Sequence, residues 1–146
     1  MEKIKIKLIR PTSKAPTYGS AHAAGADIYA DIDTPLEILP HQTAMIPSGF
    51  AIEIPDGFAG FVYPRSGMAT KRGLASANKV GVIDSDYRGE VMVALHNHSE
   101  TPALLSPGER IAQIIIAPVY TPGFEITEEL SDTERGEGGF GSTGYK

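Results

Sequence analysis

The chain has 146 residues, a length typical of one domain, and 41% of them are hydrophobic, which is within the globular range. Its net charge of −5 argues against a protein that coats nucleic acid by general electrostatics, although a small polyanion can still bind where arginines, a metal or backbone amides gather. The absence of cysteine excludes a disulfide framework and a thiolate metal site, and it is compatible with a cytoplasmic location.

The first ten residues alternate between polar and apolar side chains. Ile4, Ile6 and Leu8 interleave with lysines, and this period of two predicts a half-buried strand. The same segment has no continuous apolar run, so we expect no signal peptide. The longest apolar stretch, from Ile114 to Val119, is too short to cross a bilayer, and we expect no membrane partner.

Further strands are predicted along the chain. Apolar residues alternate again over residues 50–54 and 91–95, and a nearly continuous apolar run over 111–119 predicts a strand buried on both sides, in the core or at a subunit interface. Turn residues separate these segments. The predicted turns are Pro47-Ser48-Gly49, Asp56-Gly57, Pro107-Gly108 and Pro122-Gly123.

Short strands with turn chemistry between them predict an all-β fold, a distorted jelly-roll-like β-barrel. We expect one short helix over residues 66–72, because Gly67 and Gly73 bracket it. The composition changes after about Glu128, so the prediction is a barrel domain over residues 1–128 and a flexible glycine-rich tail over 129–146.

The tail carries the first candidate site. Five of the nine residues from 136 to 144 are glycine, and they satisfy G-x-G-x-x-G. A dinucleotide site needs a helix after the glycines, and Ser142 stands where a P-loop has lysine, so neither motif applies. What remains is backbone that can approach phosphate closely, with Arg135 and Phe140 beside it. The alternative is a disordered, solubilising tail.

Two further segments combine charge with turn residues. Asp84, Asp86 and Arg88 are predicted at a hairpin tip, where Tyr87 adds an exposed ring; a carboxylate beside a ring suits a nucleotide, and the alternative is a solvated turn. Arg65 and Ser66 precede the predicted helix and form a possible anion site, and the alternative is an ordinary helix cap by Ser66.

Two clusters of possible metal ligands point to a site less clearly than the segments above. The spacing of Asp27, Asp31 and Asp33 does not match an EF-hand loop, although one of these carboxylates could hold a hydrated magnesium ion. His96 and His98 are expected on one face of a strand, and without a third ligand we interpret them as surface or interface residues.

Taken in order, five segments resemble the motifs of the homotrimeric dUTPase family over residues 24–144. They read AGADIYA, YPRSGMATKRGL, NKVGVIDSDYRGE, GERIAQIII and RGEGGFGSTG. The resemblance implies a jelly-roll-like barrel, a homotrimer, and magnesium-assisted hydrolysis of dUTP to dUMP and pyrophosphate, which lowers dUTP and supplies dUMP for thymidylate synthesis. It also implies that each site draws the second and fourth motifs from one chain, the third from a neighbour, and the tail from the remaining chain.

The resemblance also implies roles for single residues. Asp84 matches the carboxylate that activates water for attack on the α-phosphorus and holds the 3′-hydroxyl, and Tyr87 matches the residue that packs under the deoxyribose. The positions that hold the phosphate chain are Arg65, Ser66, Gly67 and Gln113. The backbone that reads uracil runs from Asn78 to Met92 and includes Gly81, Val82 and Ile83.

In the tail, the resemblance has Arg135 bind the γ-phosphate and Phe140, followed by Gly141, close over the uracil. Asp27 matches a carboxylate near the hydration shell of Mg²⁺, which binds chiefly through phosphates and water. A dCTP deaminase-like enzyme and a non-catalytic nucleotide-binding protein on the same fold are the alternatives. The spacing of Asp84 and Tyr87 favours water attack on phosphorus over deamination.

Overall fold

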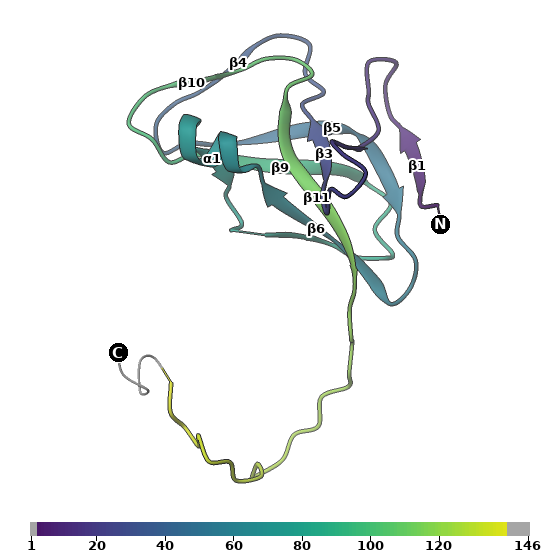
Figure 1. The fold of residues 1–146 in the computed structure, drawn as a ribbon, viewed down its shortest axis with the longest axis vertical. Helices are drawn as coiled ribbons and strands as arrows, with labels where there is room; N and C mark the ends of the chain where they lie inside the picture. Colours follow the sequence, from purple (N-terminus) through teal and green to yellow (C-terminus); the bar gives the residue numbers. More distant parts are fainter. Residues whose placement is uncertain (1–2, 140–146) are drawn as a thin grey trace.

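The structure is a computed structural model, and it describes residues 3–139 of the chain (Figure 1). Its elements are β1 (Lys5–Leu8), β2 (Thr17–Tyr18), β3 (Ala26–Tyr29), β4 (Leu36–Ile38), β5 (Thr43–Glu53), β6 (Phe58–Pro64), α1 (Ser66–Arg72), β7 (Leu74–Ser76), β8 (Gly81–Ile83), β9 (Glu90–Asn97), β10 (Ala103–Leu105) and β11 (Arg110–Pro118). The strands predicted near 4–8, 50–54, 91–95 and 111–119 are all present.

The strands form three antiparallel sheets. A four-stranded sheet has the order β1-β5-β9-β7, a five-stranded sheet has the order β2-β3-β11-β6-β8, and β10 pairs with β4. Apart from β2 and β3, neighbours in these sheets are not consecutive in sequence, as in a jelly roll. The predicted all-β, jelly-roll-like fold is confirmed, and within residues 3–139 the hydrogen-bonded order leaves the barrel open.

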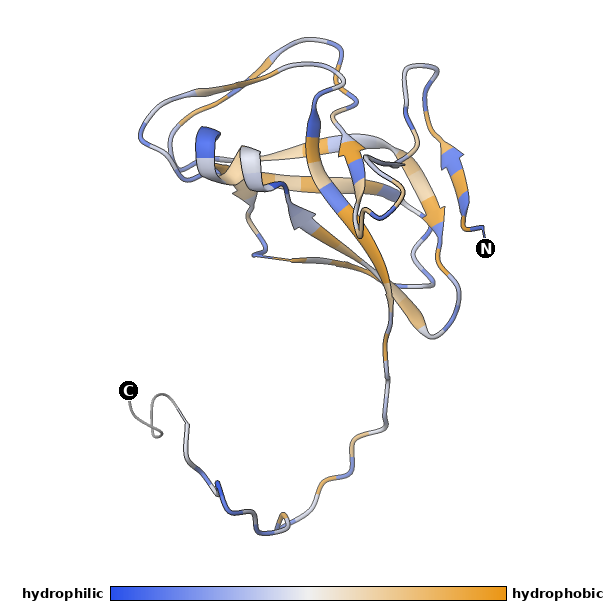
Figure 2. Cartoon of the chain, in the orientation of Figure 1, coloured by the Kyte–Doolittle hydropathy of each residue, from blue (hydrophilic) through white to orange (hydrophobic). Residues whose placement is uncertain are grey.

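Side chains from both large sheets share one hydrophobic core. Phe50, Ile28 and Leu95 are fully buried and come from β5, β3 and β9. Figure 2 shows the apolar residues concentrated along these strands. Burying each such side chain contributes roughly 1.5–3 kcal/mol to folding, which holds the sheet ends in fixed positions.

The helix α1 has the predicted bounds. Gly73 follows it with φ +66°, and its N–H donates to the Met68 carbonyl, so a left-handed glycine ends the helix. The expectation that Ser66 caps the helix is wrong. Arg65 is the N-cap residue in extended conformation, Ser66 is already helical, and no side chain caps this end.

Two predicted turns are absent. Pro47, Ser48 and Gly49 lie inside β5, where the register with β9 shifts between Pro47 and Ala51. A β-bulge uses the same residue types as a turn, which explains the wrong prediction. Pro122 lies in an irregular segment after β11, without a turn.

The first strand is less buried than its pattern predicts. Ile6 is half-buried, but Leu8 is 49% exposed. β1 is the edge strand of its sheet, and it pairs only with β5. Its alternating pattern therefore identifies a strand correctly but overstates how far the core extends.

The chain leaves the sheets after β11. Residues 120–137 are exposed, and Figure 1 shows this segment running away from the sheets. Residues 3–139 contain no helix with the length and apolar character needed to cross a membrane.

A partly buried ion pair between Arg10 and Asp31 joins the N-terminal segment to the sheets. The Asp31 carboxylate accepts hydrogen bonds from Ser13 Oγ at 2.6 Å, Arg10 Nε at 2.9 Å and Thr12 Oγ1 at 3.0 Å. Burial alone raises the pKa of Asp31, but the bonds from Ser13, Thr12 and Arg10 outweigh it and hold that pKa below its ordinary value.

We therefore expect Asp31 to stabilise the fold at neutral pH. A depressed pKa contributes stability above the unfolded-state value of about 4, and the contribution is lost as the pH falls through the folded-state value. An Asp31→Asn variant should lose about 1–3 kcal/mol of unfolding free energy at pH 7. Urea midpoints at pH 7 and pH 3 measure this. A deficit that does not shrink at pH 3 contradicts the assignment.

Candidate functional site

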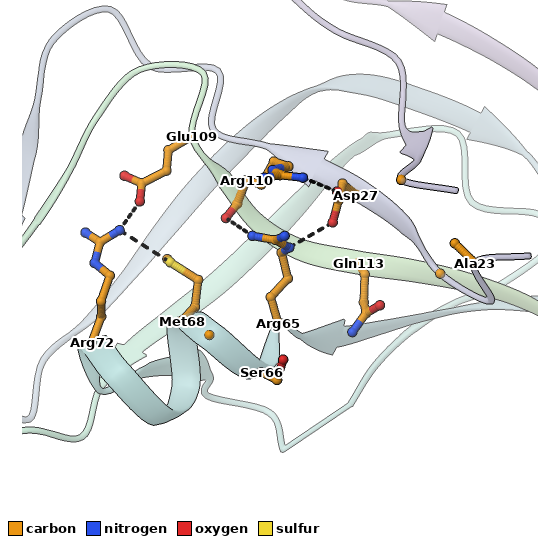
Figure 3. A pocket seen from close by; sticks show the side chains of 12 residues that line it. Ala23, Asp27, Arg65, Ser66, Met68, Arg72, Glu109, Arg110 and Gln113 are labelled. Carbon is orange, nitrogen blue, oxygen red and sulfur yellow. Dashed lines mark hydrogen bonds and ion pairs between the residues drawn. The ribbon is translucent and has the colours of Figure 1, made fainter. Parts of the chain in front are cut away.

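A cavity of about 520 Å³ opens where β3, β11 and the start of α1 meet. Three arginines and two carboxylates line it, so it suits a ligand with several negative charges (Figure 3). The lining residues are Gly19, Ala23, Gly25, Asp27, Arg65, Ser66, Gly67, Met68, Arg72, Glu109, Arg110 and Gln113. We call it the arginine pocket.

Asp27 holds two of these arginines. Its carboxylate pairs with Arg65 Nε at 2.8 Å and with Arg110 Nη1 at 3.1 Å, and its side chain is 14% exposed. The pairing of β3 with β11 brings Asp27 close to Arg110, because Asp27 lies opposite Gln113 and Arg110 begins the same strand. Figure 3 shows Arg65 and Arg110 both pointing toward this carboxylate. Two fixed guanidinium groups in a pocket bind phosphate oxygens with defined geometry.

The remaining predicted phosphate residues are also here. Gln113 donates from Nε2 to the Pro64 carbonyl at 3.0 Å, which fixes the end of its side chain. A Cβ at Gly25 would lie 2.5 Å from Gln113 Oε1, so a larger residue there would have to displace the Gln113 amide. Ser66 and Gly67 are exposed on the first turn of α1 at the rim. The structure thus brings together the residues predicted from the first, second and fourth motifs.

Sequence reasoning missed three charged residues of this pocket: Arg72, Glu109 and Arg110. Arg72 forms an ion pair with Glu109, and its Nη1 also donates to Met68 Sδ at 3.4 Å. All three lie within the segments that match the second and fourth motifs, and the count of charges in those segments was the available signal.

A second, smaller cavity of about 210 Å³ lies at the end of β8. Its lining residues are Val82, Ile83, Asp84, Tyr87, Val91 and Met92. The Tyr87 hydroxyl donates to the Glu90 carbonyl at 2.9 Å, and the Tyr87 N–H donates to the Asp84 carbonyl at 3.2 Å. The ring is therefore fixed beside the exposed Asp84 carboxylate. We call this cavity the Asp84 pocket.

The predicted hairpin around Asp84 is wrong. β8 pairs with β6, whereas β9 pairs with β5 and β7, so the segment 84–89 crosses from one sheet to the other. Sequence proximity of two apolar segments does not show which strands pair. The crossing puts the segment on the rim between the sheets, where a ligand can reach it.

The two pockets share no lining residue. In the β6–β8 register, Ile83 lies opposite Gly60 and Gly81 opposite Val62. Asp84 is thus beside the beginning of β6, while Arg65 follows its end. Six strand residues at about 3.3 Å each separate the two levels by roughly 20 Å. One chain therefore does not bring Asp84 and Arg65 onto the same phosphate group.

Uracil-reading backbone was predicted from Asn78 to Met92. Asn78 is exposed before β8, and its Nδ2 lies 3.1 Å from the position of a Cβ at Gly81, so glycine keeps this backbone accessible. Gly81 and Val82 continue β8 toward the Asp84 pocket, and Met92 lines it from β9. Of these residues, Val82 and Met92 therefore line the same pocket as Asp84 and Tyr87.

In the tail, Arg135 Nε donates to the Gly138 carbonyl at 2.8 Å, and Gly136 has φ +52°. Arg135 does not line either pocket. The predictions for Phe140 and Gly141 fall outside the described residues.

Possible metal ligands do not form a cluster in the part of the chain that the structure describes, which has no group of three or more His, Asp or Glu side chains suited to a metal. His96 Nδ1 instead lies 3.0 Å from Thr43 Oγ1, and His98 follows the end of β9. Asp27 is the carboxylate best placed for an ion carried by a ligand, because each of its oxygens keeps a lone pair beyond its arginine contact.

Comparisons with known proteins agree with this geometry. A family model described as dUTPase matches residues 12–144. A protein of Janthinobacterium sp. (strain Marseille), named deoxyuridine 5′-triphosphate nucleotidohydrolase, is 45% identical and covers 99% of both chains. A protein with the same name from Desulfitobacterium hafniense (strain DSM 10664 / DCB-2) is 49% identical and covers 97% of this chain and 96% of its own.

Solved structures show the same fold. The dUTPase of Staphylococcus bacteriophage 80alpha, with dUPNHPP, superposes with a TM-score of 0.91 at 28% identity and covers 99% of both chains. A mutant dUTPase from phage phi11 of S. aureus, described for its structural Mg(II) ion, superposes with a TM-score of 0.77 at 23% identity, covering 88% of this chain and 98% of its own.

Proposed function

Since this chain belongs to the dUTPase family and hydrolyses dUTP to dUMP and pyrophosphate, we propose that its two pockets are halves of active sites assembled between neighbouring chains of a homotrimer. The β6–β8 register carries the proposal. The water-activating carboxylate and the phosphate-binding arginine of one chain are roughly 20 Å apart along β6, so a complete site needs Asp84 from another chain.

The arginine pocket receives the triphosphate. Arg65 and Arg110 already face one point through their shared partner Asp27, which reduces the entropy lost when phosphate oxygens bind. Ser66 and Gly67 approach the chain from the first turn of α1, and Gln113 presents its fixed amide beside them. The aligned donors stabilise the negative charge that builds on the phosphates during the reaction.

The Asp84 pocket of the neighbour receives the nucleoside. Tyr87 packs under the deoxyribose and leaves no room for a 2′-hydroxyl, while the backbone from Asn78 to Met92 pairs with the uracil edge. Asp84 takes a proton from water as the water oxygen bonds to the α-phosphorus. The bond to the bridging oxygen breaks in the same step, and pyrophosphate leaves.

Magnesium fits this arrangement as an ion carried by the triphosphate. It keeps most of its waters and needs few protein ligands, so Asp27 would accept a hydrogen bond from a coordinated water. Bound there, the ion supplies charge neutralisation on the phosphates. Asp27 meanwhile keeps both arginines oriented.

The tail completes the site from the remaining chain. Residues 129–146 close over the nucleotide, with Arg135 on the γ-phosphate and Phe140 and Gly141 over the uracil. In support, residues 120–137 are exposed and can reach a neighbour without disturbing the core of residues 1–128. The location of the enzyme is proposed to be cytoplasmic, with neither nucleic acid nor membrane as a partner.

A nucleotide panel tests the proposed function. The pure protein is incubated separately with dUTP, dCTP, dTTP and UTP, with and without Mg²⁺, and pyrophosphate and nucleotide products are measured. We expect dUMP and pyrophosphate from dUTP only, with roughly 10⁴-fold discrimination where buried groups are left unpaired by the wrong base. Removal of Mg²⁺ should lower the rate strongly.

The alternatives predict other products. Ammonia released from dCTP would identify a deaminase on this fold, and dUTP binding without turnover would identify a nucleotide-binding protein. Equal hydrolysis of dUTP and UTP would contradict the role proposed for Tyr87.

A further inference from the structure

A partly buried hydrogen-bond network includes Glu90, the residue whose carbonyl accepts from the Tyr87 hydroxyl of the Asp84 pocket. Glu90 begins β9, and its Oε1 accepts from Arg10 Nη2 at 2.7 Å and from the Gly49 N–H at 2.8 Å. Arg10 continues to Asp31, with Nε donating to Oδ2 at 2.9 Å. We call Arg10, Asp31, Gly49 and Glu90 the Arg10 network.

The network is closely packed. The Asp31 side chain is 7% exposed and that of Glu90 is 23% exposed. Gly49 has φ +77°, and a Cβ there would lie 2.1 Å from Asp31 Oδ2. The β5 bulge is therefore built so that the Gly49 N–H reaches Glu90 while Asp31 packs against its Cα. Arg10 and Gly49, from two separate segments, thus contact the first residue of β9 directly, and Asp31 holds Arg10 in place.

From these contacts we infer that Arg10 and Glu90 are positioning residues for the sugar specificity of the enzyme, an inference that rests on the proposed function of Tyr87. The Tyr87 hydroxyl donates to the Glu90 carbonyl at 2.9 Å. Because Arg10 holds the Glu90 side chain, Arg10 and Glu90 together fix the position of the Tyr87 ring. A Cβ at Gly89 would lie 2.4 Å from the Tyr87 hydroxyl oxygen, so the ring lies directly on the backbone that Glu90 anchors.

The physical consequence concerns selectivity. A ring that excludes a 2′-hydroxyl must be fixed within a fraction of an ångström, because a small retreat opens space for one oxygen atom. Releasing Glu90 should therefore let UTP react better relative to dUTP. The arginine pocket contains none of the four network residues, so its phosphate contacts should be retained.

The test uses the full-length chain and the ratio of kcat/KM for dUTP over UTP. Glu90→Ala should lower this ratio by about tenfold, less than the ~100-fold that a full ångström of misplacement can cost. Glu90→Gln keeps an amide oxygen that accepts from both donors and should restore most of the ratio. Glu53→Ala is the matched control, because it removes an exposed ion pair with Lys5 on the same sheet and should leave the ratio unchanged.

A second variant and a second measurement guard against misfolding and against failure of the proposed function. Arg10→Lys cannot reach both carboxylates with one fork, and it should lower the ratio without adding to the effect of Glu90→Ala. Amide hydrogen exchange should accelerate in residues 84–90 of both variants. That measurement requires no assumption about the substrate.

The kcat/KM ratio and the exchange rates separate a positioning role of the Arg10 network from a purely structural one. Equal losses toward dUTP and UTP, with an unchanged ratio, would show that the network serves stability alone and would overturn the inference. Unchanged exchange in residues 84–90 would overturn it as well. A Tyr87→Ala variant whose ratio matches the parent would refute the proposed sugar role instead, and the exchange result would then decide whether the network positions this segment.

Discussion

An Asp84→Asn variant is expected to lose roughly 10²–10⁴-fold in kcat while it still binds dUTP, because a positioned general base contributes about that much. Asparagine keeps the shape and one acceptor oxygen for the 3′-hydroxyl, but it does not take a proton from water. Asp84 is exposed at the end of β8, so the change should leave the melting temperature unaltered. Pyrophosphate release gives the rate, and calorimetry with the imido analogue dUPNHPP gives the affinity.

Asp86→Asn is the matched control for this experiment. It removes the same charge two residues away in the same exposed segment, where no catalytic role is proposed. An equal loss in both variants would mean that the net charge of the segment matters rather than a proton acceptor. If the Asp84→Asn variant retains more than about half of the parent rate, Asp84 is not the general base.

Deletion of all residues after Glu134 is expected to leave the proposed trimer intact and to lower the turnover rate strongly. The missing part contains Arg135 and Phe140, which are proposed to bind the γ-phosphate and to cover the uracil. Loss of preorganised charge stabilisation at a reacting phosphate costs about 10²–10³-fold in rate. Residues 120–134 are exposed and stay in the shortened chain, and the described residues that the deletion removes, 135–139, are not part of the hydrophobic core. Light scattering measures assembly, and pyrophosphate release measures turnover.

A shorter deletion of residues 145–146 is the control, because it lies beyond the fifth motif. It should retain activity. Dissociated monomers after the longer deletion would refute the proposal that the tail serves catalysis without serving assembly. Full turnover by the shortened chain would refute the catalytic role itself.

Much of the fold could be predicted from local chemistry. The alternating residues of β9 and the apolar run of β11 are strands, and Gly73 ends α1 in the left-handed conformation that a bracketing glycine suggests. These features depend on neighbours within a few residues. For the same reason the sequence predicts a turn where the structure has a bulge at Gly49, since both conformations need the same residue types.

The candidate site was predicted only in part. Gln113 and Asp27 meet because β3 and β11 pair in one register, which no single segment encodes. The separation of Asp84 from Arg65 likewise depends on β8 pairing with β6 and not with β9. Long-range pairing decides these distances, so the sequence could name the residues but not which of them share a pocket.

The distance between Asp84 and Arg65 also determines how a mutation in one chain affects an assembly that contains intact chains. If each site takes its proton acceptor from one chain and its phosphate anchor from another, a lesion at Asp84 spares the phosphate half built by its own chain and disables a neighbour whose gene is intact. In a mixed assembly each chain that lacks Asp84 then disables one site, so the fraction of active sites falls in proportion to the dose of the defective chain. The activity of each site therefore depends on the sequences of all the chains that build it, and selection acts on the assembly as well as on the single chain.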